Sequence, residues 1–204
     1  MSAAIAMLGG GEQARVIAEA ATLSGLRVLG AIDDTSQAGL THLGKDQDLA
    51  DNQSLRDSCG WIIAIGNNAS RQRVATHWAG RLRFISVVHH RAWISPSAHI
   101  GVGVFVGPGA IIHNGAIIGD HTIINSSSVI EHDAHIGDGV HIAPGAVLGG
   151  GVHIGSGVLV GIGARIRDHR SIGTAAVIGM GAVVISDVAG GVTMLGNPAR
   201  ERKS

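Results

Sequence analysis

A six-residue repeat of aliphatic side chains runs through the second half of the chain and limits what the chain can fold into. From Ile94 to Val184 every sixth residue is Ile, Leu or Val, sixteen times in succession without an insertion. Glycine often follows the aliphatic residue, as at Gly101, Gly119 and Gly137. A period of six does not fit the 3.6 residues per turn of an α-helix, in which each glycine would also cost about 1 kcal/mol. The repeat therefore predicts short strands and tight turns over residues 94–187.

Short strands and turns that repeat every six residues predict a parallel β-helix. Each strand points one aliphatic side chain inward, and Gly, Asp or Asn turns the corner to the next strand. Three sides complete a coil of about 18 residues, and neighbouring coils stack at the strand spacing of about 4.8 Å. The repeat is long enough for about five coils. Because no insertion interrupts it, we expect a plain prism from which no long loop extends.

The composition excludes several classes of protein. The 32 glycines occur with only 4 prolines, unlike collagen, and 45% hydrophobic residues are too many for a disordered chain. Lys and Arg (15) balance Asp and Glu (15), so we expect neither a nucleic-acid partner nor a membrane surface. The single cysteine, Cys59, cannot form an internal disulfide. Since the N-terminus also lacks a signal-peptide pattern and no long apolar run occurs, we expect a cytoplasmic protein.

The first part of the chain alternates apolar runs with segments of helical spacing. This alternation is typical of βαβ units. We therefore expect an α/β, Rossmann-like domain over residues 1–90, followed by the all-β domain over residues 91–204. The expected strands of the first domain cover residues 3–8, 27–32, 61–65 and 84–88, and the expected helices cover residues 12–23 and 71–78.

A glycine-rich turn joins the first expected strand to the first expected helix. Such a turn at a helix N-terminus is a common phosphate cradle. The pattern Gly9-x-Gly11-x-x-Ala14, with Asp33 after the second strand, loosely fits the dinucleotide fingerprint, so a nicotinamide or flavin cofactor is one alternative. The segment is about half the size of a full dinucleotide domain. A single nucleotide, or the nucleotide end of a nucleotide sugar, fits this size better.

A small Rossmann-like domain followed by a hexapeptide β-helix resembles the bacterial sialic-acid O-acetyltransferase and UDP-4-amino-sugar (bacillosamine-type) N-acetyltransferase family. The likeness covers nearly the whole chain, and the most specific of its motifs holds the family's catalytic histidine. The motifs are Ile63-Ala-Ile-Gly-Asn-Asn68 with Arg71, Ile94-Ser-Pro-Ser-Ala98, Asn125-Ser-Ser-Ser-Val-Ile-Glu-His132 and Gly196-Asn-Pro-Ala-Arg200. The resemblance implies a left-handed β-helix and a homotrimer with active sites between subunits. It also implies transfer of acetyl from acetyl-CoA to the amine of a nucleotide-linked, UDP-type 4-amino sugar in bacterial glycan biosynthesis.

The resemblance also implies roles for individual residues. His132 is expected to be the general base and Asp133 the carboxylate that orients it. An imidazole with a pKa near 6.5 can accept the amine's proton at neutral pH, and a carboxylate on its other nitrogen fixes the tautomer. Backbone N–H groups or His141 would donate to the oxyanion. The implied acetyl-CoA contacts are His141, Gly149, Gly161 and Gly179, and the implied nucleotide-sugar contacts are Gly9, Gly10, Gly11, Gln13, Asp33, Asp34, Asn67 and Asn125.

The chain departs from the family's pattern at two places. Close relatives carry Glu after the catalytic histidine, whereas Asp133 is one methylene shorter, which puts its contact with His132 in doubt. The glycine loop of the family often contains a histidine, whereas here the run is Gly9-Gly-Gly-Glu-Gln13.

Three other functions remain open at this level. O-acetylation of sialic acid or a related sugar would use the same base. A zinc hydratase of the carbonic anhydrase type is suggested by His135 and His153, which are 18 positions apart and should stack, but catalytic zinc needs three protein ligands and no third is evident, so we expect no metal. A nucleotide-sugar sensor would keep both domains and need no base. Cys59 matches no nucleophile motif, and we expect it to be a buried small residue.

Overall fold

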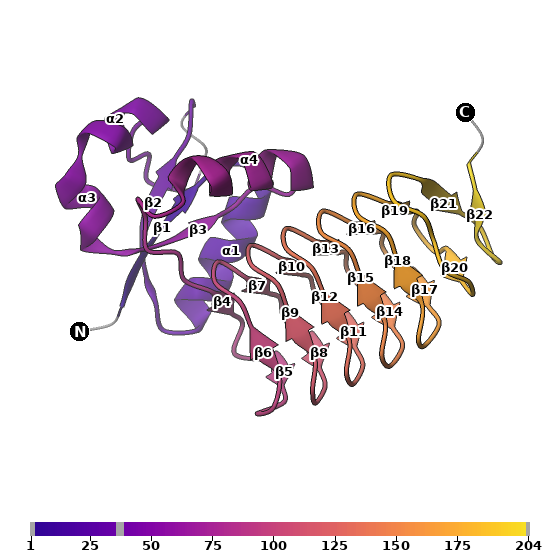
Figure 1. Cartoon of the computed structure of the whole chain (residues 1–204). Helices are drawn as coiled ribbons and strands as arrows, with labels where there is room; N and C mark the ends of the chain where they lie inside the picture. The colour runs from indigo at the N-terminus through magenta and orange to yellow at the C-terminus, as the bar shows by residue number, and fades with distance from the viewer. Residues whose placement is uncertain (1–2, 36–38, 203–204) are drawn as a thin grey trace.

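The computed structural model describes residues 3–35 and 39–202, which form an α/β layer followed by a long β-helix (Figure 1). The α/β layer contains a parallel sheet with the strand order β2-β1-β3. Helix α1 connects the first two of these strands. The elements of the layer are β1 (Ala4–Leu8), α1 (Glu12–Leu23), β2 (Arg27–Ile32), α2 (Asp46–Asp51), α3 (Gln53–Ser58), β3 (Gly60–Ile63) and α4 (Asn68–Trp78).

The β-helix has three faces built from two-residue strands, each paired in parallel with strands of the same face in the coils next to it. The first face contains β4 (Val87–Val88), β7 (Phe105–Val106), β10 (Ile123–Ile124), β13 (His141–Ile142), β16 (Leu159–Val160), β19 (Val177–Ile178) and β21 (Thr193–Leu195). The second face contains β5 (Trp93–Ile94), β8 (Ile111–Ile112), β11 (Val129–Ile130), β14 (Val147–Leu148), β17 (Arg165–Ile166) and β20 (Val183–Val184). The third face contains β6 (His99–Ile100), β9 (Ile117–Ile118), β12 (His135–Ile136), β15 (His153–Ile154) and β18 (Ser171–Ile172). A last strand, β22 (Arg200–Glu201), pairs antiparallel with β21.

The six-residue repeat predicted the inward-facing residues correctly. Ile130 lies in register with Ile112 on one side and Leu148 on the other, and all three side chains are fully buried. Each coil therefore covers the apolar edge of the next, which a single coil could not bury alone. This stacking confirms the predicted parallel β-helix.

The β-helix begins earlier than predicted. The expected strand 84–88 is divided, because Phe84 bridges to Trp61 of the α/β layer, whereas Val87 and Val88 pair with β7 of the β-helix. Val88 lies six residues before Ile94, so it continues the repeat by one step. The second face has six strands, and the stack therefore has about six coils instead of five.

The α/β layer follows the prediction closely for β1, α1 and β2 but not for the rest. Helices α2 and α3 were not predicted, since α2 buries only Leu49 and α3 buries no side chain, which leaves no apolar period to detect. Helix α4 begins at Asn68, three residues earlier than expected. The cause is a cap, because the Asn67 side chain accepts a hydrogen bond from the Ser70 N–H at 2.9 Å.

The α/β layer covers the first coils of the first face. The outward side chains of Phe105 and Ile123 are buried there in one cluster with Ile17 of α1 and Val87. Farther along the same face, the outward side chains of Leu159 and Val177 remain half-buried. The layer therefore shields one end of this face and leaves the other end accessible.

A buried arginine joins the two parts. The Arg71 side chain on α4 is 1% exposed and donates six hydrogen bonds, one of them to the Asn68 side chain. Five backbone carbonyls accept the others, those of Ile65 and Gly66 in the α/β layer and of His121, Gly139 and Val140 in the β-helix. Asn68 adds two bonds of its own to the β-helix, to the carbonyls of Gly157 and Val158.

We predict that Arg71→Ala destabilises the protein strongly, because it removes a donor from five backbone carbonyls, of which those of Gly139 and Val140 are buried. The free energy of unfolding should fall by about 3 kcal/mol or more. Arg73→Ala in the same helix is the matched control, since Arg73 is exposed and its side chain donates to the Ser70 hydroxyl of the same helix. It should change stability by no more than about 0.5 kcal/mol. Urea unfolding of both variants is the measurement, and equal midpoints would contradict this role of Arg71.

Candidate active site

The glycine loop, the start of α1 and the end of β3 enclose a cavity of about 480 Å³. The helix start is suited to an anion, because no side chain caps α1 and its first N–H groups stay available. Four of the predicted nucleotide-sugar residues come together here. The lining residues are Gly9, Gly11, Glu12, Gln13, Asp33, Ala64, Ile65 and Gly66. A smaller cavity of about 170 Å³ shares Gly9, Asp33 and Ile65 with it and adds Asp34.

Hydrogen bonds fix part of this cavity. The Asp33 carboxylate accepts from the Gly10 N–H at 2.6 Å and from the Thr35 N–H at 3.2 Å, so it holds the glycine loop in place. The Gln13 side-chain nitrogen is buried and has no hydrogen-bond partner among the described residues. A buried donor without a partner is costly, and here it belongs to a residue that lines the cavity. The Asn67 side chain, by contrast, is engaged as the cap of α4.

His141 and Asn125 lie side by side near the edge between the first and second faces. The Asn125 Nδ2 atom is 3.2 Å from His141 Nε2. Burial lowers the pKa of His141 to about 4, helped by the positive charge of Arg71 and opposed by a hydrogen bond with the Gly66 backbone. The ring is therefore neutral at physiological pH. Gly66 also lines the cavity at the start of α1, so His141 is in contact with the wall of that cavity.

His132 and Asp133 lie on the edge between the second and third faces, directly after β11. Their contact was in doubt because of the short carboxylate, yet His132 Nδ1 is 2.9 Å from Asp133 Oδ2. The hydrogen bond to Asp133 raises the pKa of His132 although its side chain is 52% exposed. With Nδ1 engaged as a donor, Nε2 keeps the lone pair that a general base needs.

The backbone of Asp133 is itself unusual. Its φ of +58° lies in the left-handed region, where the residues one coil away on either side, Gly115 and Gly151, are glycines. A side chain costs free energy in this conformation, although Asp tolerates it better than most residues. The same conformation occurs at other turns of the β-helix, namely at His121, Ser127, His169 and Ala175. The left-handed turn places the carboxylate beside the ring of His132.

Within one chain, the structure does not bring the predicted transfer residues together. Asn125, Gly161 and Gly179 occupy one column along the first edge, in which Ala143 lies between the first two, whereas His132 and Gly149 lie along the second edge. The three glycines also have a reason within the fold. A Cβ atom on Gly149 would lie 2.5 Å from the Asp168 N, one on Gly161 would lie 2.7 Å from the Ile178 O, and one on Gly179 would meet Leu195. Their contact with acetyl-CoA remains a prediction.

Sequence reasoning missed two participants in these arrangements. Arg71 was noted as part of a motif, but its role depends on carbonyls that are 50 and more positions away in the chain. Gly66 was not expected to line the nucleotide cavity, although its place directly after a buried apolar run is a signal for a loop at the end of a parallel strand.

Cys59 and the pair of histidines lie as the sequence predicted, the cysteine buried and the histidines stacked. Cys59 is buried, and burial raises the pKa of its thiol, which keeps it protonated and a poor nucleophile. His135 and His153 pair in register, and their rings stack at 4.8 Å between centroids. In residues 3–35 and 39–202, no three His, Cys, Asp or Glu side chains are grouped as a metal site.

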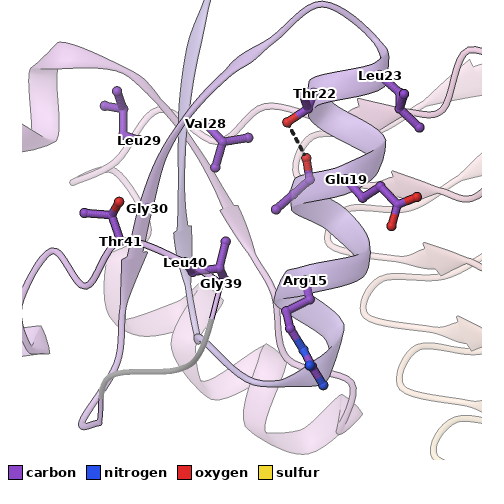
Figure 2. A pocket seen from close by; sticks show the side chains of 11 residues that line it. Arg15, Glu19, Thr22, Leu23, Val28, Leu29, Gly30, Gly39, Leu40 and Thr41 are labelled. Atoms are coloured by element: carbon purple, nitrogen blue, oxygen red, sulfur yellow. Dashed lines mark hydrogen bonds between the residues drawn. The ribbon is translucent and has the colours of Figure 1, made fainter.

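A further cavity of about 490 Å³ lies between α1 and the outer edge of β2, as Figure 2 shows. Its titratable side chains, Arg15 and Glu19, come from α1, and none of the predicted site residues lines it. The lining residues are Arg15, Ala18, Glu19, Thr22, Leu23, Val28, Leu29, Gly30, Gly39, Leu40 and Thr41. Across the described ranges, no helix is long and apolar enough to span a membrane.

Both parts of the chain match models of known protein families. The PglD N-terminal domain family matches residues 4–78, and the bacterial transferase hexapeptide family (six repeats) matches residues 115–150. No curated protein matches the chain.

Solved structures are similar over the whole length. A variant of perosamine N-acetyltransferase from Caulobacter crescentus, in complex with CoA and GDP-perosamine, is 30% identical with a TM-score of 0.93, covering 98% of this chain and 97% of that one. The acetyltransferase domain of PglB from Neisseria gonorrhoeae FA1090, in complex with acetyl coenzyme A, is 30% identical with a TM-score of 0.92 and coverages of 99% and 100%. WeeI from Acinetobacter baumannii AYE is 27% identical with a TM-score of 0.87 and coverages of 98% and 100%.

We predict that His141 makes stability depend on pH below neutrality. Its pKa is about 4 in the folded chain and near the ordinary 6.5 in the unfolded chain, so only the unfolded chain takes up this proton as the pH falls between these values. The free energy of unfolding should fall by up to about 3 kcal/mol over that range because of this group. His141→Gln should remove this part of the slope, whereas the exposed His153→Gln should keep it. Identical slopes in wild type and His141→Gln, measured by urea unfolding from pH 7 to pH 4, would refute the assignment.

Proposed function

Since this chain belongs to the bacillosamine-type sugar N-acetyltransferase family of hexapeptide-repeat enzymes, whose fold is a left-handed β-helix, we propose that it acetylates the amine of a nucleotide-linked 4-amino sugar. It is an acetyltransferase with acetyl-CoA as co-substrate, as CoA and acetyl-CoA in its relatives indicate. The observation that carries the proposal is the hydrogen bond between His132 Nδ1 and Asp133 Oδ2. It leaves the other ring nitrogen of an exposed histidine free to accept a proton.

His132 supplies the proton chemistry of the proposed reaction. Acetyl-CoA supplies the acetyl group on a thioester. As the sugar nitrogen bonds to the carbonyl carbon, His132 Nε2 accepts the proton that the nitrogen loses, and Asp133 stabilises the imidazolium. His132 then returns the proton to the sulfur when the carbon–sulfur bond breaks. The raised pKa of His132 strengthens the base, which must nevertheless be neutral to act, so activity should decline as the pH falls below that pKa.

The nucleotide is proposed to bind at the start of α1. A diphosphate would meet the free N–H groups of the helix and the unpaired Gln13 donor, and Asp33 holds the loop that forms the site. Glu12 in the first turn brings a negative charge that a phosphate must avoid. We propose UDP as the nucleotide from the resemblance, with GDP as the alternative because the Caulobacter relative holds GDP-perosamine. We also propose a cytoplasmic location, which suits the single, buried, unpaired Cys59.

We further propose that three copies of the chain assemble through the second face. The outward side chains of this face are apolar, except for one arginine, and Trp93 is 51% exposed. They are Trp93, Ile111, Val129, Val147, Arg165 and Val183. The third face instead presents His99, Ile117, His135, His153 and Ser171. An exposed apolar face of this kind marks an interface, and packing against it would bring His132 of one chain near Asn125 and His141 of another.

The assembly can be tested by mutation of the second face. Val129→Asp places a charge in the proposed interface and should yield a monomer of 20.7 kDa, whereas the wild type should sediment at three times that mass. His153→Asp on the third face is the matched control and should leave the assembly unchanged. A wild-type monomer in sedimentation equilibrium would contradict the trimer.

The activity can be tested with a panel of substrates. The protein is incubated with acetyl-CoA and with UDP-, GDP-, dTDP- or CMP-linked sugars, with and without an amino group, while free thiol is followed. We expect turnover with an amino sugar, and a loss of about 10²- to 10⁴-fold in His132→Ala, because general-base catalysis contributes factors of this size.

The control is His135→Ala, which removes an exposed histidine three positions away and should keep full activity. Turnover with amine-free sugars alone would refute N-acetylation and favour a sugar O-acetyltransferase. Full activity in His132→Ala would refute the assigned base. Stoichiometric zinc in chelator-free protein would instead favour a hydratase of the carbonic anhydrase type.

A further inference from the structure

Gly150 lies 18 positions after His132, at the equivalent place in the next coil, and against the imidazole ring. The two coils are joined there by a hydrogen bond from the Gly151 N–H to the His132 carbonyl at 2.8 Å. A Cβ atom on Gly150 would lie 2.5 Å from His132 Nε2 and 2.7 Å from Cε1, and the third nearest atom also belongs to this ring. Gly150 is buried, although its neighbours in the same column, His132 and Asp168, are exposed. The His132 ring is the group that covers it.

The backbone does not explain why glycine occupies this position. Gly151 and Gly115 on the same edge have φ values of +62° and +70°, where only glycine is free of strain. Gly150 is not among the residues with positive φ. The coil stacking explains Gly149, whose Cβ would collide with the backbone at Asp168, but the nearest atoms to a Cβ on Gly150 are those of a side chain. The feature that requires glycine at position 150 is therefore the imidazole of His132.

The His132 ring cannot easily move away from an alanine methyl group at position 150 and also keep its hydrogen bond to Asp133. Its Nδ1 is tied to Asp133 Oδ2, and Asp133 is tied to the coil below by the hydrogen bond from its N–H to the Asn114 carbonyl at 3.0 Å. Contacts under 3.0 Å force one partner to move, and here the movable partner is the exposed side chain of His132. A rotation that relieves the contact pulls Nδ1 away from the carboxylate.

We propose that Gly150 is a positioning residue, whose missing side chain lets the His132 ring lie against the next coil while it is bonded to Asp133. This inference rests on the proposed function, because it assumes that the orientation of His132 matters for proton transfer. The glycine sets where Nε2 points, and hence where the acceptor amine must be held. A base that is off by about 1 Å can lose about 100-fold in rate.

The test is Gly150→Ala, compared with Asp133→Asn and with the control Asp168→Ala, which changes an exposed residue one coil farther along the same column. Alanine keeps the backbone N–H and needs no unusual φ, so the melting temperature should not change. We expect acetyl transfer to fall about 100-fold in Gly150→Ala, with unchanged affinity for acetyl-CoA. Asp168→Ala should match the wild type.

A second readout does not depend on activity. The ring signals of His132, assigned by their loss in His132→Ala, are titrated by NMR. Asp133 and Glu131 are the charged neighbours that raise its pKa, and the bond to Asp133 contributes most. We expect Gly150→Ala to lower this pKa, because the hydrogen bond to Asp133 is lost while the charge of Asp133 remains, and Asp133→Asn to lower it as well by removing that charge.

The outcomes separate the two proposals. If Gly150→Ala leaves the pKa of His132 at the wild-type value, the positioning role is overturned, even if the rate falls. If no sugar is acetylated by the wild type, the proposed function fails, and the titration still decides the role of Gly150. In a His132→Ala background, Gly150→Ala should have no further effect on the rate, because no ring remains to be displaced. A further loss there would also overturn the proposal.

Discussion

The architecture depends on the buried side chain of Arg71. Its guanidinium is removed from water, which lowers its pKa to about 10, and it remains charged at neutral pH because five backbone carbonyls and Asn68 surround it. The planar fork of donors suits such a cluster, whereas the compact ammonium of lysine could not reach all of these acceptors. By bonding at once to Gly66, which lines the nucleotide cavity, and to the coils at Gly139 and Val140, Arg71 fixes the two parts of the chain relative to one another.

The β-helix could be predicted because its information is local and repeats. Every coil presents the same inward positions, so Ile112, Ile130 and Leu148 are recognisable without knowledge of the remainder of the chain. The contact between His132 and Asp133 is also local, but the shorter carboxylate of Asp133 left it open at the level of the sequence. The hydrogen bonds of Arg71 and the contact between Gly150 and the His132 ring were harder to predict. They depend on residues that are distant in the sequence and meet only when the coils stack. In the α/β layer, α2 and α3 lack the apolar spacing that reveals a helix.

The candidate site residues lie on two different edges of the β-helix. One edge of the prism holds His132 and Asp133, and another holds Asn125 and the neutral His141, whose low pKa results from burial beside Arg71. A straight prism has no loop that could fold back and join the two edges. In the proposed trimer a second chain completes each site, and it packs against the apolar second face between these edges.

The antiparallel strand β22 has a consequence for solubility. A stack of parallel coils ends in a row of free backbone groups, onto which further coils, from any chain, could add. On the first face the chain reverses after β21, and β22 covers that open row with the exposed, charged side chains of Arg200 and Glu201. The hairpin replaces a parallel template with an antiparallel, charged edge. Such an edge disfavours the addition of further coils to this face, a hazard that arises from the same repetition that makes the fold stable.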